Sequence, residues 1–530
     1  MYEALLLTNN HSRLGPLANM PNKQLILDHV PGCPFEQDFK SALSPEDFQD
    51  VQGDILVPFP KRTEDFCFFE ITNPEGFKKA LATLITDGKI SSTEKVANDR
   101  KEIAEWKDSG RKDLKAVQNM NISFTYNGLK TLGFDPEELP SSGRQILHKG
   151  QLADASNLGD PLENGKPKDW LDQFKNKHDK IHGVLLVACD SGETVEKCRQ
   201  DLTALLGGHV DIIYQFQGDT RSNVKNKDKQ TLKDHEHFGW KDGISNPWLK
   251  DVFCECRKIP GQPEIDRGIV LLGHPGDHNQ SQEIPDGHWA KNGSYLVCRK
   301  LAQLVPEFHK FMFDNPVALD IPGLTPDQLR KRGADLRAAQ FVGRWPLGTP
   351  LEISALEEKP DIAGNAQENN KFIYNQKDQS RCPFSAHIRK MNPRQSEGAM
   401  GGHGFGKNFL IRQGITYGPE VTENENSSHK SDPSPELSRG LAFVSYQSDI
   451  TEGFQFQQKS WANFTGFPIT APIQPGFDPL IGQARSSQQF TTQDTHNNPI
   501  RLQRFVRPLG GTYSFLPSIK ALKKIAGIDV

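Results

Sequence analysis

The sequence predicts an α+β fold made of two ferredoxin-like halves, each an antiparallel sheet with peripheral helices. The first observation is a series of short apolar runs of strand length that alternate with segments of helical periodicity in residues 50–245. The second is a further round of strands and helices in residues 246–530. The third is the length of 530 residues, which is enough for two domains with sizeable cores.

The predicted domain boundaries follow from these segments. Residues 1–49 are mixed in composition and contain proline without a sustained period, so we expect an irregular arm that wraps the body. We place the N-terminal ferredoxin-like domain at residues 50–245 and the C-terminal one at residues 246–530. The halves share no sequence repeat of about 20–50 residues, so we expect them to repeat in fold pattern only.

The first half is predicted to run strand, helix, strand, strand, helix, strand. This is the ferredoxin-like order once a short helix ending near Gly133 is set aside. The strands are short and apolar, and we expect them at residues 65–71, 121–125, 182–189 and 210–218. The helices are expected at residues 74–85 and 193–206. The charged segment 87–118 is predicted to be a solvated insertion, and the polar segment 140–180 a long loop.

The second half is predicted to repeat this alternation. Its strands are expected at residues 268–273, 293–299, 408–412 and 440–446. Its helices are expected at residues 305–318, 325–340 and 451–463. The chain closes with an apolar segment over 505–518 and a lysine-rich helix. Residues 360–380 are expected to form a loop, and residues 420–438 an exposed connector.

Composition and charge argue against two classes of partner. The formal net charge is -4 and the pI is near 6.5, so we expect no nucleic-acid binding. The mean hydropathy is -0.61 and the sequence has no 18-residue apolar run, so we expect no transmembrane helix and no membrane partner. The start of the chain lacks a basic region and a long apolar run. We therefore expect no signal peptide and favour an intracellular location.

The cysteine pattern favours free thiols. The 8 cysteines are dispersed and form no C-x-x-C pair, so neither a zinc ribbon nor a thioredoxin motif is indicated. Cys67, Cys189 and Cys298 lie in apolar, strand-like runs, where a buried free thiol is the expected state.

Three stretches carry side chains that suggest a chemistry. In residues 381–394, His387 has basic residues on both sides. In Gly239-Trp240-Lys241-Asp242-Gly243, an aspartate lies in a glycine-bounded turn. In residues 409–418, Arg412 follows apolar residues on a predicted strand. An iron-binding histidine, a carboxylate that accepts a proton and a fixed cation are the groups that a haem peroxidase needs.

Together with other blocks in the same order, these stretches resemble the dye-decolorizing peroxidases, in particular the larger fungal type. The resemblance runs from about Val51 to the C-terminus. Its blocks are residues 51–56, 237–247, 342–345, 382–394, 441–447 and 477–483. A Gly-x-x-Asp-Gly turn alone is a weak signal, whereas the ordered set is specific. The resemblance implies two ferredoxin-like halves with haem in the C-terminal half, which agrees with the fold predicted above.

The resemblance also implies one haem b per chain, with His387 as the proximal ligand of the iron. It points to Asp478 as the acceptor of the other imidazole N–H, the usual arrangement for a ligand histidine. It makes Arg394 a partner of a haem propionate, which a guanidinium binds well. Taken without the resemblance, His387 and Arg394 would each be a solvated residue in a basic turn.

Asp242 and Arg412 are the expected catalytic pair. The carboxylate would take a proton from the peroxide oxygen at the iron and return it to the far oxygen before the O–O bond breaks. Aspartate has a reference pKa of about 3.9 and remains a base in acid, so we expect an acidic optimum. The permanent cation of Arg412 would stabilise negative charge on the peroxide and keep Asp242 ionised. The alternatives are an aspartate that caps its own turn and a strand arginine in a surface pair.

Apolar residues are implied to limit access to the haem. Ile244 lies in the motif block, and Leu441 and Phe443 alternate to one strand face, where they would admit small molecules such as peroxide. Plain core packing is the alternative for these side chains. Bulky dyes would then need electron transfer through surface aromatic residues, and Trp461, in a polar setting, is the candidate relay.

We therefore expect a haem-dependent peroxidase that reduces hydrogen peroxide and oxidises dyes and phenolic compounds in one-electron steps. Its partners would be hydrogen peroxide and aromatic or dye-like reducing substrates. The alternative is a non-catalytic haem-binding protein for storage, transport or sensing. Haem binding alone requires neither Asp242 nor Arg412, and the presence of both favours the enzyme.

Overall fold

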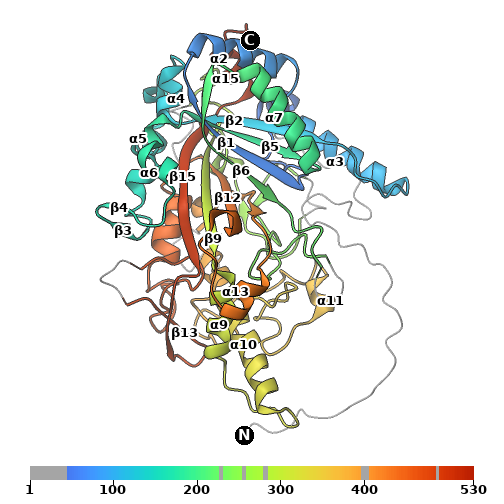
Figure 1. The fold of residues 1–530 in the computed structure, drawn as a ribbon, viewed down its shortest axis with the longest axis vertical. Helices are drawn as coiled ribbons and strands as arrows, with labels where there is room; N and C mark the ends of the chain where they lie inside the picture. The colour runs from blue at the N-terminus through green and yellow to red at the C-terminus, as the bar shows by residue number, and fades with distance from the viewer. Residues whose placement is uncertain are drawn as a thin grey trace.

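The structure is a computed structural model that describes residues 44–529 except for 226–230, 254–257, 278–283, 395–404 and 485–488. The predicted arm therefore lies mostly outside the described residues, and its last part forms the helix α1 (Pro45–Asp50). Figure 1 shows long strands through the centre of the molecule, with α2, α7 and α15 at one end and α9 and α10 toward the other.

The main feature is a 9-stranded sheet with the strand order β10-β12-β9-β15-β2-β5-β1-β6, in which β11 also pairs with β12. The strands of the first half are β1 (Thr63–Ile71), β2 (Gln118–Phe124), β5 (Gly183–Cys189) and β6 (Val210–Asp219). Those of the second half are β9 (Ser294–Gln303), β10 (Ile411–Arg412), β11 (Ile415–Tyr417), β12 (Gly440–Gln447) and β15 (Val506–Leu516). Every neighbouring pair is antiparallel, which confirms the predicted α+β class with antiparallel sheets.

Both halves use the same strand order. When β11 is set aside and the strands are numbered along the chain within each half, they lie side by side in the order second, third, first and fourth. The two halves meet where β15 pairs with β2 through Phe515 and Phe124. The last long strand of the chain therefore belongs to the sheet of the second half and also contacts that of the first.

Helices surround this sheet. In the first half they are α2 (Pro74–Thr86), α3 (Thr93–Asp108), α4 (Tyr126–Thr131), α5 (Ser141–Asp154), α6 (Asp172–Asn176) and α7 (Gly192–Leu206). In the second half they are α9 (Val305–Asp314), α10 (Pro326–Val342), α11 (Pro360–Ala363), α12 (His387–Met391), α13 (Glu423–Ser428), α14 (Phe454–Phe456), a π-helical turn (Gln457–Ala462) and α15 (Ile519–Ala526). Two-stranded ribbons are formed by β3 (Leu162–Glu163) with β4 (Lys166–Pro167), β7 (Trp248–Leu249) with β8 (Glu264–Ile265), and β13 (Thr491–Gln493) with β14 (Pro499–Arg501).

The alternation of side chains along β1 shows how the sheet separates two cores. Phe69 belongs to a cluster that includes Phe77 of α2 and Leu522 of α15, so this face is covered by helices. Phe66 and Phe68, which alternate with it, belong to a second cluster that contains strand residues of both halves. Successive side chains point to opposite faces, so the continuous apolar run at residues 66–69 of β1 supplies apolar side chains to both faces.

Three segments differ from the prediction because local composition did not reveal their surroundings. The polar segment 140–180 is not a long loop, since it contains α5 and α6. The apolar run 268–273 is not a strand. It forms a 3₁₀ turn over Arg267–Ile269, and the buried Leu271 belongs to the second cluster. A short apolar run alone does not distinguish a buried turn from a strand. Residues 451–463 form α14 and the π-helical turn in place of one regular helix.

The predicted connector 420–438 also supplies one member of a buried ion pair. Glu425 of α13 accepts hydrogen bonds at 2.7 and 2.8 Å from Arg439, which immediately precedes β12, and both side chains are buried. Burial raises the pKa of Glu425, but hydrogen bonds from Arg439 and from the backbone of Asp432 and Thr422 outweigh it and lower this pKa to about 2. The connector is therefore fixed to the sheet by charge.

This pair predicts a pH-dependent loss of stability in the variant Glu425→Gln. We expect the variant to unfold with a free energy lower by about 3 kcal/mol at neutral pH, because Arg439 is left buried without its carboxylate. The folded-state pKa lies below the unfolded value, so the stabilisation is complete above about pH 4.5 and is lost as the pH falls toward 2. Urea unfolding at pH 7 and at pH 3 measures both effects. The exposed Glu423→Gln, in the same helix, is the control and should change stability by no more than about 0.5 kcal/mol. An equal loss at both pH values would contradict the assignment.

Candidate active site

The main cavity has a volume of about 290 Å³ and brings together residues from distant parts of the chain. Its walls come from the loop after β6, the end of α10, the helix α12, and the strands β9, β10, β12 and β15. Of the predicted site residues, seven line it: Asp242, Ile244, His387, Arg394, Arg412, Leu441 and Phe443. Its lining is largely apolar with a few polar groups, as is usual for a cofactor or small-molecule site.

His387 is the first residue of the short helix α12, and its imidazole is held by a buried carboxylate. Its Nδ1–H donates to Oδ2 of Asp478 at 2.8 Å. The other carboxylate oxygen of Asp478 accepts the backbone N–H groups of Leu480 and Ile481 at 2.8 and 3.0 Å. Burial raises the pKa of Asp478, but the attraction of His387 and these hydrogen bonds outweigh it and lower this pKa. The arrangement fixes the ring and leaves Nε2 as the nitrogen available to a metal.

Asp242 is presented by a loop whose shape is fixed by backbone geometry and by one buried carboxylate. Gly239 and Gly243 have φ values of 106° and 71°, a region that glycine adopts without strain. Glu236 accepts the N–H groups of Phe238 and Trp240, each at 2.8 Å. The N–H of Gly243 also donates to Asp242 at 2.6 Å, so the aspartate caps its own turn while it faces the cavity.

Arg412 lies beside Asp242, on the two-residue strand β10. Its Nη1 is 3.8 Å from Oδ1 of Asp242, and its Nη2 donates to the carbonyl of Ser245 at 3.2 Å. The side chains of Arg412 and Asp242 are 41% and 45% exposed, so the arginine is less buried than its apolar sequence neighbours suggested. Asn246 joins the loop to β10, because its side chain donates to the carbonyl of Arg412 at 3.0 Å and accepts its N–H at 3.2 Å.

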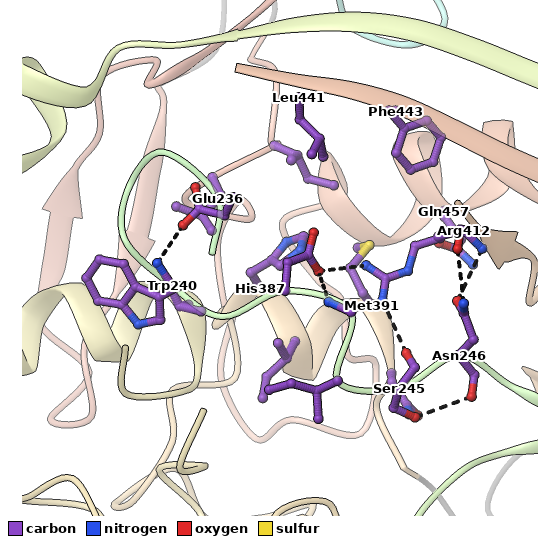
Figure 2. Close-up of a pocket in the computed structure, with 18 of the residues that line it drawn as sticks. Glu236, Trp240, Ser245, Asn246, His387, Met391, Arg412, Leu441, Phe443 and Gln457 are labelled. Atoms are coloured by element: carbon purple, nitrogen blue, oxygen red, sulfur yellow. Dashed lines mark hydrogen bonds and ion pairs between the residues drawn. The ribbon is translucent and has the colours of Figure 1, made fainter. Parts of the chain in front are cut away.

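Leu441 and Phe443 project from β12 toward this cavity, with His387 below them in the view of Figure 2. They are two residues apart on one strand and therefore share a face, as the alternation predicted. In the sheet, Leu441 is paired with Leu301 and Phe443 with Arg299 of β9, and both partners line the cavity as well. One side of the cavity is thus formed by the surface of the sheet.

Two arginines in the cavity wall have neutral partners. Arg394 donates to the carbonyls of Gly261, Asn370 and Phe372 at 3.1, 2.9 and 3.1 Å. The buried Arg344 donates to the carbonyls of Gly348 and Asn369 at 2.8 and 2.7 Å and to the side chain of Asn370 at 3.1 Å. Burial, together with the nearby cation of Arg394, lowers the pKa of Arg344 to about 10. Within the described residues, neither arginine has a carboxylate partner, so this part of the wall suits an anionic group.

Sequence reasoning missed the roles of Glu236, Arg344 and Asn246. Glu236 lies in the polar stretch His235-Glu236-His237 and holds the loop of Asp242. His237 is likewise structural, because its Nε2–H donates to the carbonyl of Tyr417 at 2.9 Å. Glu236 binds nearby backbone groups, whereas Asn246 and Arg344 have partners farther along the chain. Only Asn246 and Arg344 lie in motif blocks that could have drawn attention to them.

The prediction that Trp461 is a surface residue is wrong. Its side chain is fully buried, with a relative exposure of 0%, and stacks on Phe467 at 5.5 Å between ring centroids. Trp461 does not line the cavity. It contacts Phe409, which does line it, with 6.1 Å between the ring centroids. The polar neighbours Lys459 and Ser460 suggested exposure, whereas the apolar contacts of the ring come from residues that the local sequence does not show.

A second cavity of about 210 Å³ meets the first at Asp242, Arg412 and Leu441. Its other walls include the polar residues Lys61, Lys233 and His235. The catalytic candidates therefore stand where the two cavities meet.

No helix within the described residues is long and apolar enough to cross a bilayer. The five described cysteines, Cys67, Cys189, Cys198, Cys298 and Cys382, are buried and free. This confirms the prediction made for Cys67, Cys189 and Cys298.

Comparisons with known proteins find a matching family model and several relatives. A family model described as the DyP dimeric alpha+beta barrel domain matches residues 50–222. The dye-decolorizing peroxidase of Mycetinis scorodonius is 37% identical over 517 residues, which cover 94% of this chain and 91% of that protein. The relative from Auricularia auricula-judae is 32% identical, with the same coverage of 94% and 91%.

Solved structures are similar over almost their whole length. A variant of the dye-decolorizing peroxidase from Pleurotus ostreatus is 37% identical with a TM-score of 0.80, and the match covers 90% of this chain and 99% of that one. An ancestral D-type dye-decolorizing peroxidase is 42% identical with a TM-score of 0.79, over 91% and 99% of the two chains. A dye-decolorizing peroxidase in complex with 2,6-dimethoxyphenol is 33% identical with a TM-score of 0.76, over 91% and 100%.

Proposed function

This chain belongs to the dye-decolorizing peroxidase family, and from that premise we propose that its main cavity holds one haem b with His387 as the axial ligand. Its activity is that of a dye-decolorizing peroxidase, an oxidoreductase. The observation that supports the proposed site is the meeting of two pairs in one cavity. His387 is bonded to Asp478, and Asp242 lies beside Arg412.

The residues of the cavity fit a haem. The ring of His387 is 24% exposed, and the cavity it lines offers its Nε2 to an iron. Arg344 and Arg394 supply guanidinium groups whose described partners are neutral, which suits the carboxylates of the propionates. Leu441 and Phe443 supply an apolar wall for the macrocycle. A haem bound there supplies the iron at which the peroxide O–O bond is cleaved and which exchanges electrons with the donor.

Side chains of the protein then transfer the proton and stabilise the developing charge. Asp242 accepts the proton of the peroxide oxygen that faces the iron and returns it to the outer oxygen, which leaves as water. Arg412, with Nη1 3.8 Å from Asp242, keeps the carboxylate ionised and stabilises negative charge on the peroxide. Asp478 keeps the imidazole of His387 in the tautomer that offers Nε2. Leu441 and Phe443 keep larger molecules away from this chemistry.

The reducing substrates proposed for this chain are aromatic or dye-like compounds. A relative has been solved in complex with 2,6-dimethoxyphenol, a small phenol. A bulky dye does not fit a cavity of about 290 Å³, so its electrons must come through the protein. We propose Trp461 only as an inner relay of electron transfer, because a fully buried ring cannot touch a dye. Such a relay needs a second aromatic residue nearer the surface.

The fold supports the same proposal. The strand order of each half is that of a ferredoxin-like unit, and we assign the halves to residues 50–245 and 246–530. The loop with Asp242 ends the first half, whereas His387, Arg412, Leu441 and Phe443 all come from the second. The haem is accordingly proposed to belong to the C-terminal half, with the first half contributing the acid–base group.

The test is an absorbance spectrum of the haem-loaded protein before and after one equivalent of hydrogen peroxide. We expect a Soret band that changes with peroxide and returns when a phenolic donor is added. A Soret band that peroxide leaves unchanged would instead support a non-catalytic haem-binding protein. No Soret band after loading would overturn the proposed cofactor.

Arg412→Met should lower kcat/KM for hydrogen peroxide by about 10²–10³-fold, because a preorganised cation at developing negative charge contributes about that much. Haem content should not change, since Arg412 is not among the groups proposed to hold the cofactor. Steady-state kinetics with a phenolic donor measure this effect. The matched control is Arg381→Met, which replaces an exposed arginine at the start of the segment 381–394 that contains His387. A loss below tenfold would contradict the role of Arg412.

A further inference from the structure

Lys390 is a buried lysine that lies three residues after His387 in the same short helix, α12. Its relative exposure is 0%. Its Nζ donates to two backbone carbonyls, that of Phe464 at 3.0 Å and that of Gly476 at 2.6 Å. A buried lysine is rare unless it is paired, yet within the described residues no carboxylate lies within ion-pair distance of Nζ. The lysine therefore calls for an explanation beyond packing.

The carbonyls that Lys390 binds belong to the structure that holds Asp478. Gly476 lies two residues before Asp478, and its N–H donates to the carbonyl of Thr465 at 2.9 Å. The N–H of Asp478 donates to the carbonyl of Ala462, also at 2.9 Å. The two segments thus run side by side, and the ammonium of Lys390 binds a carbonyl of each.

A closed ring of contacts results. Helix α12 contacts the Asp478 loop twice, once from His387 to the carboxylate and once from Lys390 to the carbonyl of Gly476. These two bonds add to the backbone bonds of Gly476 and Asp478 and hold the loop against α12 at two points. The helix therefore contributes to the position of the carboxylate relative to the imidazole.

The charge of Lys390 acts on the same carboxylate. Burial lowers the pKa of Lys390 to about 7, and the negative charge of Asp478 is the influence that opposes this. The ammonium thus faces a buried anion that already accepts three hydrogen bonds, from His387, Leu480 and Ile481. A cation at this place reduces the pull of the carboxylate on the Nδ1 proton of His387.

We propose that Lys390 is a positioning residue for the peroxidase reaction, which fixes Asp478 against His387 and balances its charge, and so sets how strongly the imidazole donates to iron. This inference rests on the proposed ligation of haem by His387. It assigns to the lysine an effect on the iron that passes through Asp478. A lysine that only packs the loop would have no such effect.

The test is a double-mutant cycle on the haem-loaded protein at pH 5, with the reduction potential as the main readout. The four proteins are the wild type, Lys390→Met, Asp478→Asn and the double variant. We expect Lys390→Met to shift the potential to a more negative value, because loss of a cation favours the ferric state and frees the carboxylate to pull on Nδ1–H. In the Asp478→Asn background the same substitution should produce less than half of that shift.

Each outcome decides between alternatives. Equal shifts of the potential in both backgrounds would show that the charge acts on the iron directly. No shift in either background would show that Lys390 is a packing residue. Either result overturns the inference. If Lys390→Met does not fold, Lys390→Gln removes the charge but keeps an N–H donor, and the same cycle applies. Lys377→Met is the control, because this exposed lysine donates to the carbonyl of Thr470 nearby and should leave the potential unchanged.

A second readout separates this inference from the proposed function. The iron–histidine stretching frequency of the ferrous protein, measured by resonance Raman, should fall in Asp478→Asn and rise in Lys390→Met. Wild-type protein with no such band would show that His387 is not the ligand, which defeats the proposed site itself. A normal band that is the same in wild type and Lys390→Met would defeat only the role of the lysine.

Discussion

Asp242→Asn is expected to lower kcat/KM for hydrogen peroxide by about 10²–10⁴-fold, the range that a positioned general acid–base group contributes. The amide keeps the size of the side chain but accepts no proton from peroxide. The geometry supports this reading, because the carboxylate stands where the two cavities meet, with Arg412 3.8 Å away. Stopped-flow mixing of the haem-loaded variant with peroxide measures the step directly.

The controls for this prediction use the same loop. Haem content and the Soret band of Asp242→Asn should match those of the wild type, because Asp242 is not proposed to hold the cofactor. Asp234→Asn removes a carboxylate that lines only the second cavity and should change the rate by less than tenfold. Equal losses of rate in the two variants would mean that the rate depends on the total negative charge of the second cavity, and that Asp242 has no special role.

His387→Ala is expected to abolish the activity, because the iron would lose its only proposed protein ligand. We expect the variant to lose the Soret band of a histidine-ligated haem and to release haem to an apo-globin acceptor faster than the wild type does. Added imidazole should restore part of the spectrum, since the cavity opened by the substitution has the size of the missing ring. Absorbance spectra with and without imidazole provide the measurement.

A second histidine supplies the comparison. His309, in α9, does not line the cavity, and His309→Ala should leave the spectrum unchanged. A His387→Ala protein that retains the wild-type spectrum and activity would place the iron on another ligand. The roles of Asp478 and Lys390 would then have to be reconsidered together.

The sequence alone predicted those parts of the fold that are written in local patterns. The long strands β1, β5, β9 and β12 were predicted because each is an apolar run bounded by polar or glycine residues. Helix α5 was missed, since its glycines and polar residues resemble a loop and Gly150, at φ 72°, interrupts it. Local patterns carry no information about the partners that bury a segment, and this explains both results.

The same limit applies to the site. His387, Asp242 and Arg412 were identified because they stand in recognisable blocks, and the structure brings all three to one cavity. Glu236 was not identified, because its role depends on how its own neighbours fold into a turn, and Arg344 and Lys390 were not identified, because they bind backbone groups far away in the sequence. Trp461 was misplaced for the same reason: its immediate neighbours are polar, but the rings that enclose it are not adjacent in the chain.

The position of β15 bears on how the protein is made. This strand pairs with β9 along its length and meets β2 at Phe515, and its residues Val506 and Pro508 line the main cavity. It leaves the ribosome after the other strands of this sheet. Until then β9 lacks one neighbour and the cavity lacks part of its wall. Capture of the cofactor is therefore expected to follow synthesis of β15, and a ribosome stalled before β15 should hold a nascent chain that does not retain haem.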